Sequence, residues 1–230
     1  MNINEFYKFL IKELRNIMNT KPHYNSKNVY FLRFHRISKT FLYRPYYDNQ
    51  RAWLRVSGFQ TTGTVVKNPF TFFYVNTNDW SSAHSYQFWS KNFTAAVGVN
   101  NDEIVKTIYS PSPSGYVEPK TAAFTGFTST GGNTGNSSQF NVSGVYNKGY
   151  NFYTNGWKTG GTIFFPSLGY RDVYTGGSGG ILSVGIDCDI WSAGALSEYS
   201  GRIFGFNSST MNPQGVLVRS YGFSCRSVKE

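Results

Sequence analysis

The last quarter of the chain, residues 164–228, constrains the fold more than any other stretch. Within it and just before it, short apolar pieces alternate with clusters of Gly, Ser, Asn and Pro. Those clusters favour turns, because Gly and Asn tolerate positive φ and Pro presets φ at about −65°. Short pieces rich in Ile, Val, Phe and Trp are typical of strands and too short for stable helices. The expected strands are Thr162–Phe165, Asp189–Trp191, Arg202–Phe206, Val216–Arg219 and Gly222–Val228.

Several motifs follow one another in this region and upstream of it. They are PFTFFYVNTNDW at 69–80, KTIYSPSPSGY at 106–116, FFPSLGYRD at 164–172, IWSAGA at 190–195, GRIFGFNSSTMNP at 201–213 and SYGFSCRSVKE at 220–230. In this order they resemble the Fibrobacter-type major paralogous domain, whose usual form is KTIYDPCPAGY followed by FPAAGYR…GYYWSS…YYLYF…GFSVRPV. The resemblance covers roughly Pro69 to Glu230.

The resemblance implies an α+β, C-type-lectin-like fold, loop-rich with short antiparallel strands. The family is common in surface proteins of gut Bacteroidetes, often at the C-terminus of secreted adhesins and fimbrillin-type components. It therefore implies a non-catalytic recognition module, adhesin or fimbrial-tip-like, that binds glycan or protein through its C-terminal loop face. Three alternatives remain open: a phage receptor-binding protein, a retroelement-diversified variable protein, and a purely structural subunit.

The resemblance also assigns roles to residues. The scaffold positions are Trp191, Gly222, Phe223 and Arg226, with the Trp buried and the Arg satisfying nearby carbonyls or acids. Exposed residues between them are candidate ligand contacts, because Tyr faces beside amide, carboxylate and guanidinium groups bind sugars and proteins. These candidates are Tyr174, Asp187, Asp189, Glu198, Tyr199, Arg202, Asn207, Asn212, Gln214, Arg219 and Tyr221.

Charge divides the chain into two parts. The net charge is +10, yet residues 1–56 hold 11 Lys and Arg against three acids, which leaves 57–230 at only +2. A nucleic-acid-binding domain would concentrate basic residues on its folded body, so this distribution argues against a nucleic-acid partner. We expect a basic arm at 1–55 and a lectin-like domain at 56–230, clearest over 106–230.

The first twenty residues predict a helix within that arm. Ile3, Phe6, Leu10, Leu14 and Ile17 recur every three or four residues, which is helical spacing. Charges interrupt the stretch, so it has neither a signal-peptide core nor the roughly 18 apolar residues of a membrane span. The resemblance nevertheless implies a cell-surface or extracellular location. A fragment of a longer protein, a misplaced start and a phage-borne protein are the explanations to consider.

The sequence predicts no catalytic, cofactor or metal site. The three His residues are scattered without ligand spacing, and no Ser stands in a nucleophile motif. Asp172, Asp187 and Asp189 are interpreted as solvated loop acids rather than as a calcium site, which needs six to eight oxygens. Cys188 and Cys225 are either two buried thiols or one disulfide.

Upstream of the family-like region, β-branched and aromatic runs at Thr64–Val66 and Phe70–Val75 predict a hairpin. A long loop is expected over Asn76–Trp89. At Thr121–Phe127 we expect at most about one helical turn.

Overall fold

The computed structural model describes residues 54–57, 60–67, 71–74, 79–95, 98, 102–173 and 180–230. The arm expected at 1–55 lies outside the described residues apart from its last two positions, and so does Tyr174. The strands are β1 Leu54–Ser57, β2 Thr71–Tyr74, β3 Tyr116–Val117, β4 Val142–Ser143, β5 Gly149–Tyr153, β6 Thr162–Pro166, β7 Tyr170–Arg171, β8 Ile181–Leu182, β9 Cys188–Ala195, β10 Ser200–Phe206, β11 Met211–Val218, β12 Ser224–Cys225 and β13 Val228–Lys229. The helices are α3 Thr62–Lys67 and the 3₁₀ helices η2 Thr121–Phe127 and η3 Ser137–Gln139.

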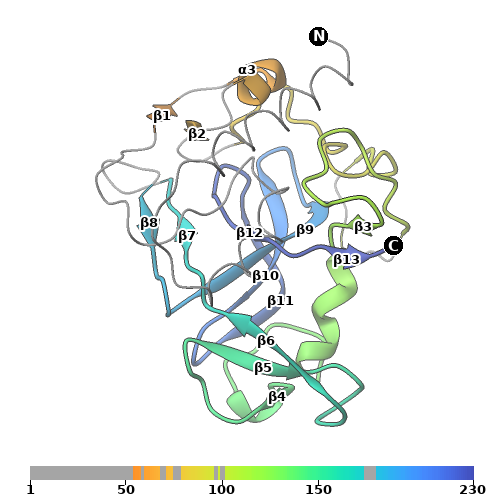
Figure 1. Ribbon diagram of the computed structural model, residues 1–230, viewed down its shortest axis with the longest axis vertical. Coiled ribbons are helices and arrows are strands. Elements are labelled where there is room, and N and C mark those ends of the chain that lie inside the picture. Colours follow the sequence, from red (N-terminus) through yellow and green to blue (C-terminus); the bar gives the residue numbers. More distant parts are fainter. Residues whose placement is uncertain are drawn as a thin grey trace, which may run out of the picture. The chain divides into compact units, whose positions relative to one another are not determined.

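The largest sheet has the strand order β11-β10-β9-β12 (Figure 1). β10 runs antiparallel to both β9 and β11, whereas β12 joins β9 in parallel. All five strand-like pieces of the C-terminal region contain strands, although β9 and β11 run longer than their apolar pieces and the last piece divides between β12 and β13. The described residues thus form a β-rich fold of small, mostly antiparallel sheets with few helices.

Smaller sheets surround this one. β4-β5-β6 is antiparallel, and β7 pairs with β8 in a two-stranded ribbon. β13 pairs with β3, so Val228 lies opposite Val117. The KTIYSPSPSGY motif and the C-terminal motif, which are more than a hundred residues apart, therefore meet in one ribbon.

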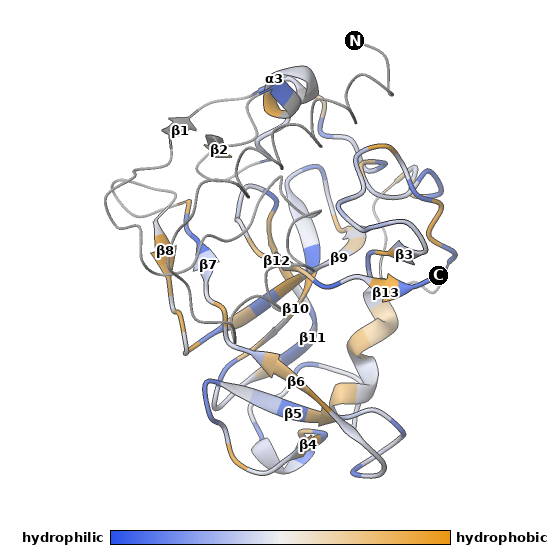
Figure 2. Ribbon diagram, viewed as in Figure 1, coloured by the Kyte–Doolittle hydropathy of each residue, from blue (hydrophilic) through white to orange (hydrophobic). Residues whose placement is uncertain are grey.

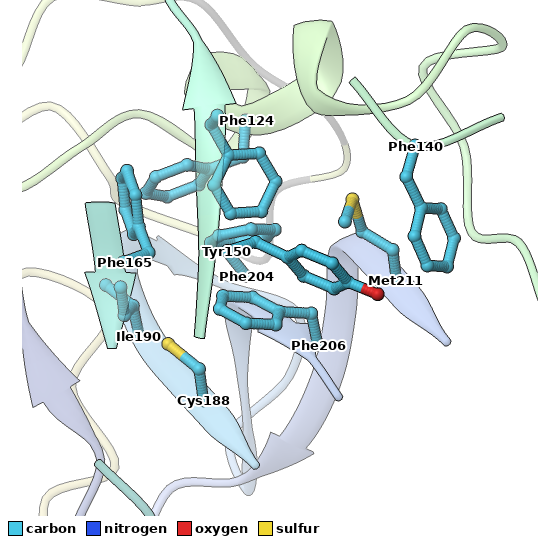
Figure 3. Close-up of a cluster of buried hydrophobic side chains, with 10 residues drawn as sticks. Phe124, Phe140, Tyr150, Phe165, Cys188, Ile190, Phe204, Phe206 and Met211 are labelled. Carbon is cyan, nitrogen blue, oxygen red and sulfur yellow. The ribbon is translucent and has the colours of Figure 1, made fainter. Parts of the chain in front are cut away.

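The main core lies where one face of β9 and β10 meets β5, β6 and η2. Alternate residues of a strand share a face, so Phe204 and Phe206 of β10 enter the same cluster (Figure 3). The cluster comprises Phe124, Phe140, Tyr150, Phe152, Phe165, Cys188, Ile190, Phe204, Phe206 and Met211. In Figure 2, β6 is largely coloured as hydrophobic, and its Phe165 belongs to this cluster. Phe124 stacks on Phe204 at 4.6 Å between ring centroids, and such pairs contribute about 0.5–1.5 kcal/mol beyond burial.

The region expected to form a hairpin does not form one. Thr64–Val66 lies inside helix α3, and β2 pairs in parallel with β1 instead. The helix starts because Thr61 caps it, its Oγ1 accepting from the backbone N–H of Thr64 at 3.2 Å. Lys67 in its last turn suits the helix dipole. A cap and local contacts outweigh β-branched propensity over so short a segment.

Candidate functional site

A Ser-rich loop, residues 79–91, is shaped by hydrogen bonds between its side chains and its own backbone. Asp79 Oδ1 accepts from the N–H of Ser81 at 3.3 Å, and Ser81 Oγ accepts from the N–H of Ala83 at 3.3 Å. A similar turn follows at Ser85. Short polar side chains stabilise turns in this way without a helix or strand. The long loop expected here is confirmed in its described part.

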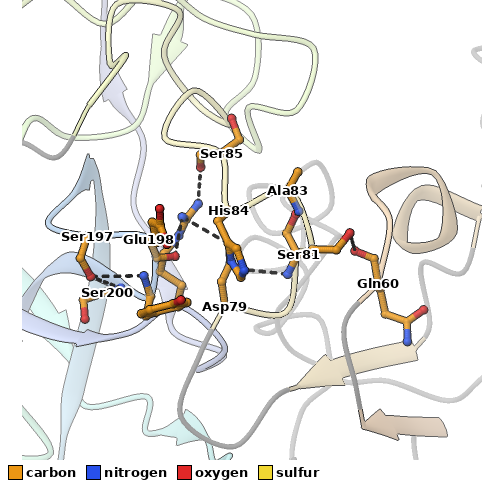
Figure 4. Close-up of polar contacts among 12 residues, drawn as sticks. Gln60, Asp79, Ser81, Ala83, His84, Ser85, Ser197, Glu198 and Ser200 are labelled. Carbon is orange, nitrogen blue, oxygen red and sulfur yellow. Dashed lines mark hydrogen bonds and ion pairs between the residues drawn. The ribbon is translucent and has the colours of Figure 1, made fainter.

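A buried ion pair anchors this loop to the end of β11. Asp79 is 1% exposed and lies 3.2 Å from Arg219 Nη1 and 3.7 Å from His84 Nδ1 (Figure 4). The Arg219 guanidinium also donates to the carbonyl oxygens of Ser85 and Glu198, the latter at 3.1 Å. One side chain thus joins three segments: the Ser-rich loop, the loop between β9 and β10, and the chain just after β11.

Burial disfavours the charged form of both Asp79 and Arg219. It raises the pKa of Asp79, against the lowering effect of the Arg219 charge. It lowers the pKa of Arg219, against the raising effect of Asp79. Two desolvated charges stay favourable only while each has the other and several hydrogen bonds. The anchor therefore depends on both side chains being present.

Next to the anchor the surface has a hollow with a volume of about 350 Å³. We call it the Phe88 hollow; it is lined by Ala83, Ser85, Gln87, Phe88, Lys91, Thr107 and Tyr109. Phe88 is held from several sides: it stacks with Trp80 at 5.6 Å, and the Arg219 guanidinium lies 5.6 Å from its ring centroid. Tyr109 meets Phe88 edge to face at 6.0 Å and is 43% exposed. The hollow thus has a fixed aromatic wall and an accessible Tyr ring.

Three predicted ligand residues lie beside this loop. Tyr199 is 42% exposed and packs edge-on against His84 with ring centroids 5.2 Å apart. Glu198 is exposed, and its carbonyl holds Arg219. Arg219 was expected to be exposed, but its side chain is only 11% exposed because it is drawn into the ion pair with Asp79.

Four other predicted ligand residues lie at the opposite end of the large sheet. Asp187 and Asp189 flank the start of β9, while Asn207 follows β10 and Asn212 is the second residue of β11. Asn207 Nδ2 donates to Asp187 Oδ1 at 3.3 Å. Because β9, β10 and β11 alternate in direction, one end of the sheet carries this group and the other carries Tyr199. The structure does not gather the predicted residues into one surface.

Asp189 was predicted to be an exposed ligand contact, but it is partly buried. It is half-buried on β9 opposite Gly205, where a Cβ would come within 2.7 Å of Asp189 Oδ1. Burial, with a smaller contribution from the Asp187 charge, raises the pKa of Asp189 to about 7. Near neutral pH this carboxyl is therefore partly protonated, unlike a solvated loop acid.

The remaining predicted ligand residues are engaged within the fold. Arg202 Nη1 donates to the Gln214 carbonyl and Gln214 Nε2 donates to the Gly131 carbonyl, both at 3.3 Å. Tyr221 stacks on Phe223 with centroids 5.0 Å apart. All three are half-buried, so each would offer a ligand only part of its polar surface.

The predicted scaffold residues lie in and around a second, smaller core cluster. Trp191 and Phe223 are 8% and 1% exposed, with ring centroids 4.8 Å apart. At Gly222 a Cβ would lie 2.8 Å from Arg171 Cβ, so a larger residue would push the backbones apart. These three positions pack the sheet and face no solvent-filled space.

Arg226, the fourth scaffold position, lies over the aromatic core. Its guanidinium is 3.9 Å from the Phe165 ring centroid, and Nη1 donates to the Phe164 carbonyl at 3.3 Å. Burial lowers the pKa of Arg226, and the nearby Cys188 opposes that shift. The guanidinium therefore closes one edge of the core by a cation–π contact.

Cys188 and Cys225 are not bridged. The parallel pairing of β12 with β9 puts Cys225 opposite Trp191, three residues beyond Cys188. That offset separates the two Cα atoms by about 10 Å along the strand, whereas a disulfide needs less than about 7 Å. Residues three apart in a strand also point to opposite faces. The disulfide alternative is therefore incompatible with this sheet.

Sequence reasoning missed the residues that line the hollow. The sequence pattern puts Phe88 on a loop and gives it no role, and it singles out neither Lys91 nor Tyr109. It also gives no role to Asp79, which anchors the loop beside the hollow. A signal was present, because the segment NDWSSAHSYQFW combines several aromatic residues with Ser and no aliphatic run. Large aromatic side chains on a polar loop either anchor the loop or face a ligand. Here Phe88 anchors and Tyr109 is exposed.

No three His, Cys, Asp or Glu side chains among the described residues lie close enough together to hold a metal ion. In the same part of the chain, no helix combines the length and apolar character needed to cross a membrane. Comparison with protein-family models, with curated proteins and with solved structures finds no match.

Proposed function

We propose that this chain is a non-catalytic recognition module of a cell or particle surface, with a C-type-lectin-like α+β fold, that binds a glycan or a protein. The Phe88 hollow carries the proposal. It presents the accessible Tyr109 ring beside the hydroxyl of Ser85, the amide of Gln87 and the ammonium of Lys91. Aromatic surface next to a few fixed polar groups is the usual composition of sites that bind sugars and polar peptides.

The anchoring of the loop supports the same function. Binding costs less when the contact groups are already ordered, and the buried Asp79–Arg219 pair holds the loop against β11 before any ligand arrives. Tyr199, next to His84, extends the surface toward the loop between β9 and β10. The family resemblance of the C-terminal motifs independently favours an adhesin or a fimbrial subunit outside the cell.

A glycan array tests the proposal, with Tyr109→Ala as the diagnostic variant. We expect the full chain to retain a set of glycans and Tyr109→Ala to lose most of that signal, because the exposed ring is removed. Tyr116→Ala is a matched control, since Tyr116 is a 40% exposed tyrosine on β3 outside the lining of the hollow. Its signal should equal that of the unmodified protein.

Two results would count against this function. Equal losses in the Tyr109 and Tyr116 variants would show that the hollow is not the site. Alanine variants of Tyr199, Arg202 and Tyr221 belong in the same array. If glycan binding is lost in one of these variants and kept in Tyr109→Ala, the binding site lies at these residues and not in the hollow. No retained glycan and no protein ligand would favour the purely structural subunit.

A further inference from the structure

The charge distribution around the Phe88 hollow indicates what kind of ligand it would take. Of the seven described residues that line it, none is acidic and one, Lys91, is basic. A hollow with a lone ammonium favours ligands that bring a negative charge, because the ion pair then forms only in the complex.

The backbone of Lys91 is fixed while its side chain is exposed. The N–H of Lys91 donates to the Val105 carbonyl at 2.9 Å, and the carbonyl of Lys91 accepts from Gln87 Nε2 at 2.9 Å. The Lys91 side chain thus extends from a backbone position that hydrogen bonds hold at the edge of the hollow. Less conformational entropy is lost when such a group meets a ligand than when a whole loop must order.

Neighbouring cations are already engaged. Arg219 is paired with Asp79, and Lys106 Nζ donates to the carbonyls of Ser112 and Pro113, each at 2.7 Å. The ion pairs between described residues all involve Asp79, and within that part of the chain Lys91 has no carboxylate partner. Among the described residues that line the hollow, Lys91 is therefore the cation available to a ligand.

From this geometry we propose that the Phe88 hollow binds an acidic sugar, with the carboxylate of the sugar on Lys91 and its ring against Tyr109. The inference rests on the proposed function and narrows its ligand class. The hollow's volume of about 350 Å³ is at the small end of ligand pockets, which span about 300–1,000 Å³. One sugar unit fits such a space, whereas a folded protein surface would need a broader face.

Oligosaccharides that carry uronic or sialic acids, each paired with its carboxyl-reduced neutral counterpart, provide the test. The two members of a pair differ at one position, where a neutral hydroxymethyl group replaces the charged carboxylate. We expect at least one acidic member to bind the full chain about two- to fivefold more tightly than its neutral counterpart, as for a partly exposed ion pair. The preference should weaken as salt is raised from 50 mM to about 500 mM, because salt screens exposed charges.

Lys91→Gln should abolish the preference and leave thermal stability unchanged, because the side chain is exposed. Lys229→Gln removes the same charge from exposed β13 and should keep the preference. Equal binding of acidic and neutral members, with dependence on Tyr109, would overturn the acidic ligand while leaving the recognition function intact. A preference that survives Lys91→Gln would also overturn it.

Two further outcomes separate the proposals. If a poly-glutamate peptide binds more tightly than every acidic sugar, and its binding depends on Lys91, then the ligand class is an acidic peptide and the acidic-sugar proposal is wrong. If no sugar or peptide binds with dependence on Tyr109 or Lys91, both the acidic ligand and the hollow as a recognition site are wrong.

Discussion

At the scale of single residues, two buried carboxylates in the described part of the chain have specific partners. Asp79 has Arg219, and the buried carboxylate of Glu118 accepts from the hydroxyls of Ser110 and Ser112. Asp189 differs, because the charge that acts on it, that of Asp187, is also negative and adds to the effect of burial. Burial raises the folded-state pKa of Asp189, so the stability that this group contributes should fall as the pH rises.

Asp189→Asn tests this at the pH where the carboxyl would ionise. The folded-state pKa of about 7 lies above the ordinary value of 3.8, so the folded state holds the proton more tightly. The stability contributed by this group is present in full below pH 4 and is lost as the pH rises toward 7. Asn resembles the protonated acid and should stabilise the protein at pH 8, by on the order of 2–4 kcal/mol, but hardly at pH 4.

Urea unfolding of both proteins at the two pH values measures the difference. Asp187→Asn is the companion variant, because removing the second cause of the raised pKa should move the transition to lower pH without abolishing it. An equal effect of Asp189→Asn at pH 4 and pH 8 would contradict the assignment.

At the scale of elements, close packing of strands decides where glycine is required. Gly201 on β10 lies under the Trp191 ring, and a Cβ there would come within 2.6 Å of Trp191 Cζ3. Trp191 cannot yield easily, because Phe223 packs 4.8 Å from it on the same side of the sheet. The small residue and the large one thus form one packing unit.

Gly201→Ala should therefore destabilise the fold by about 1–3 kcal/mol, the usual cost of overpacking. Gly161→Ala is the matched control, since nothing lies within 4 Å of the added Cβ, and it should be neutral within about 0.5 kcal/mol. Midpoints of chemical unfolding compare the two. Equal midpoints for both variants would show that the Trp191 ring moves aside freely.

The observed strands and helices also show which elements the local sequence pattern predicts correctly. The five strand-like pieces near the C-terminus were predicted by apolar runs between turn residues, and the structure confirms a strand in each. At Thr64–Val66 the same reasoning fails, because a capped helix of six residues forms there. A run that short carries too little periodicity to distinguish strand from helix.

At the scale of the molecule, the chain is tied where segments distant in sequence exchange hydrogen bonds. Glu118 is 1% exposed and accepts from the backbone N–H of Ser112 at 3.1 Å, while Ser112 Oγ also meets Ser227 Oγ at 2.7 Å. This network joins the segment before β3 to the C-terminal strands. It closes the described domain in a way that no local element does.

Replacing Glu118 by Ala should cost about 2–4 kcal/mol, because several buried donors would lose their acceptor. Glu198→Ala is the control on an exposed carboxylate and should change stability by less than about 0.5 kcal/mol. Thermal and urea unfolding report the difference, and amide exchange at Val117 and Val228 should increase in the Glu118 variant only. Unchanged exchange there would mean that the closure does not depend on Glu118.

The sequence by itself determined the β-rich class and most of the C-terminal strands, since alternation of apolar runs with turn formers is a local property. Only the tertiary structure decided which residues meet. Strand order placed Tyr199 and Asp189 at opposite ends of one sheet, turned Arg219 inward to Asp79, and separated Cys188 from Cys225. Tertiary packing also brought residues 83–91 and 107–109 together to form the Phe88 hollow. Such pairings depend on long-range packing and desolvation, whose free energies have no signature in residue spacing along the chain.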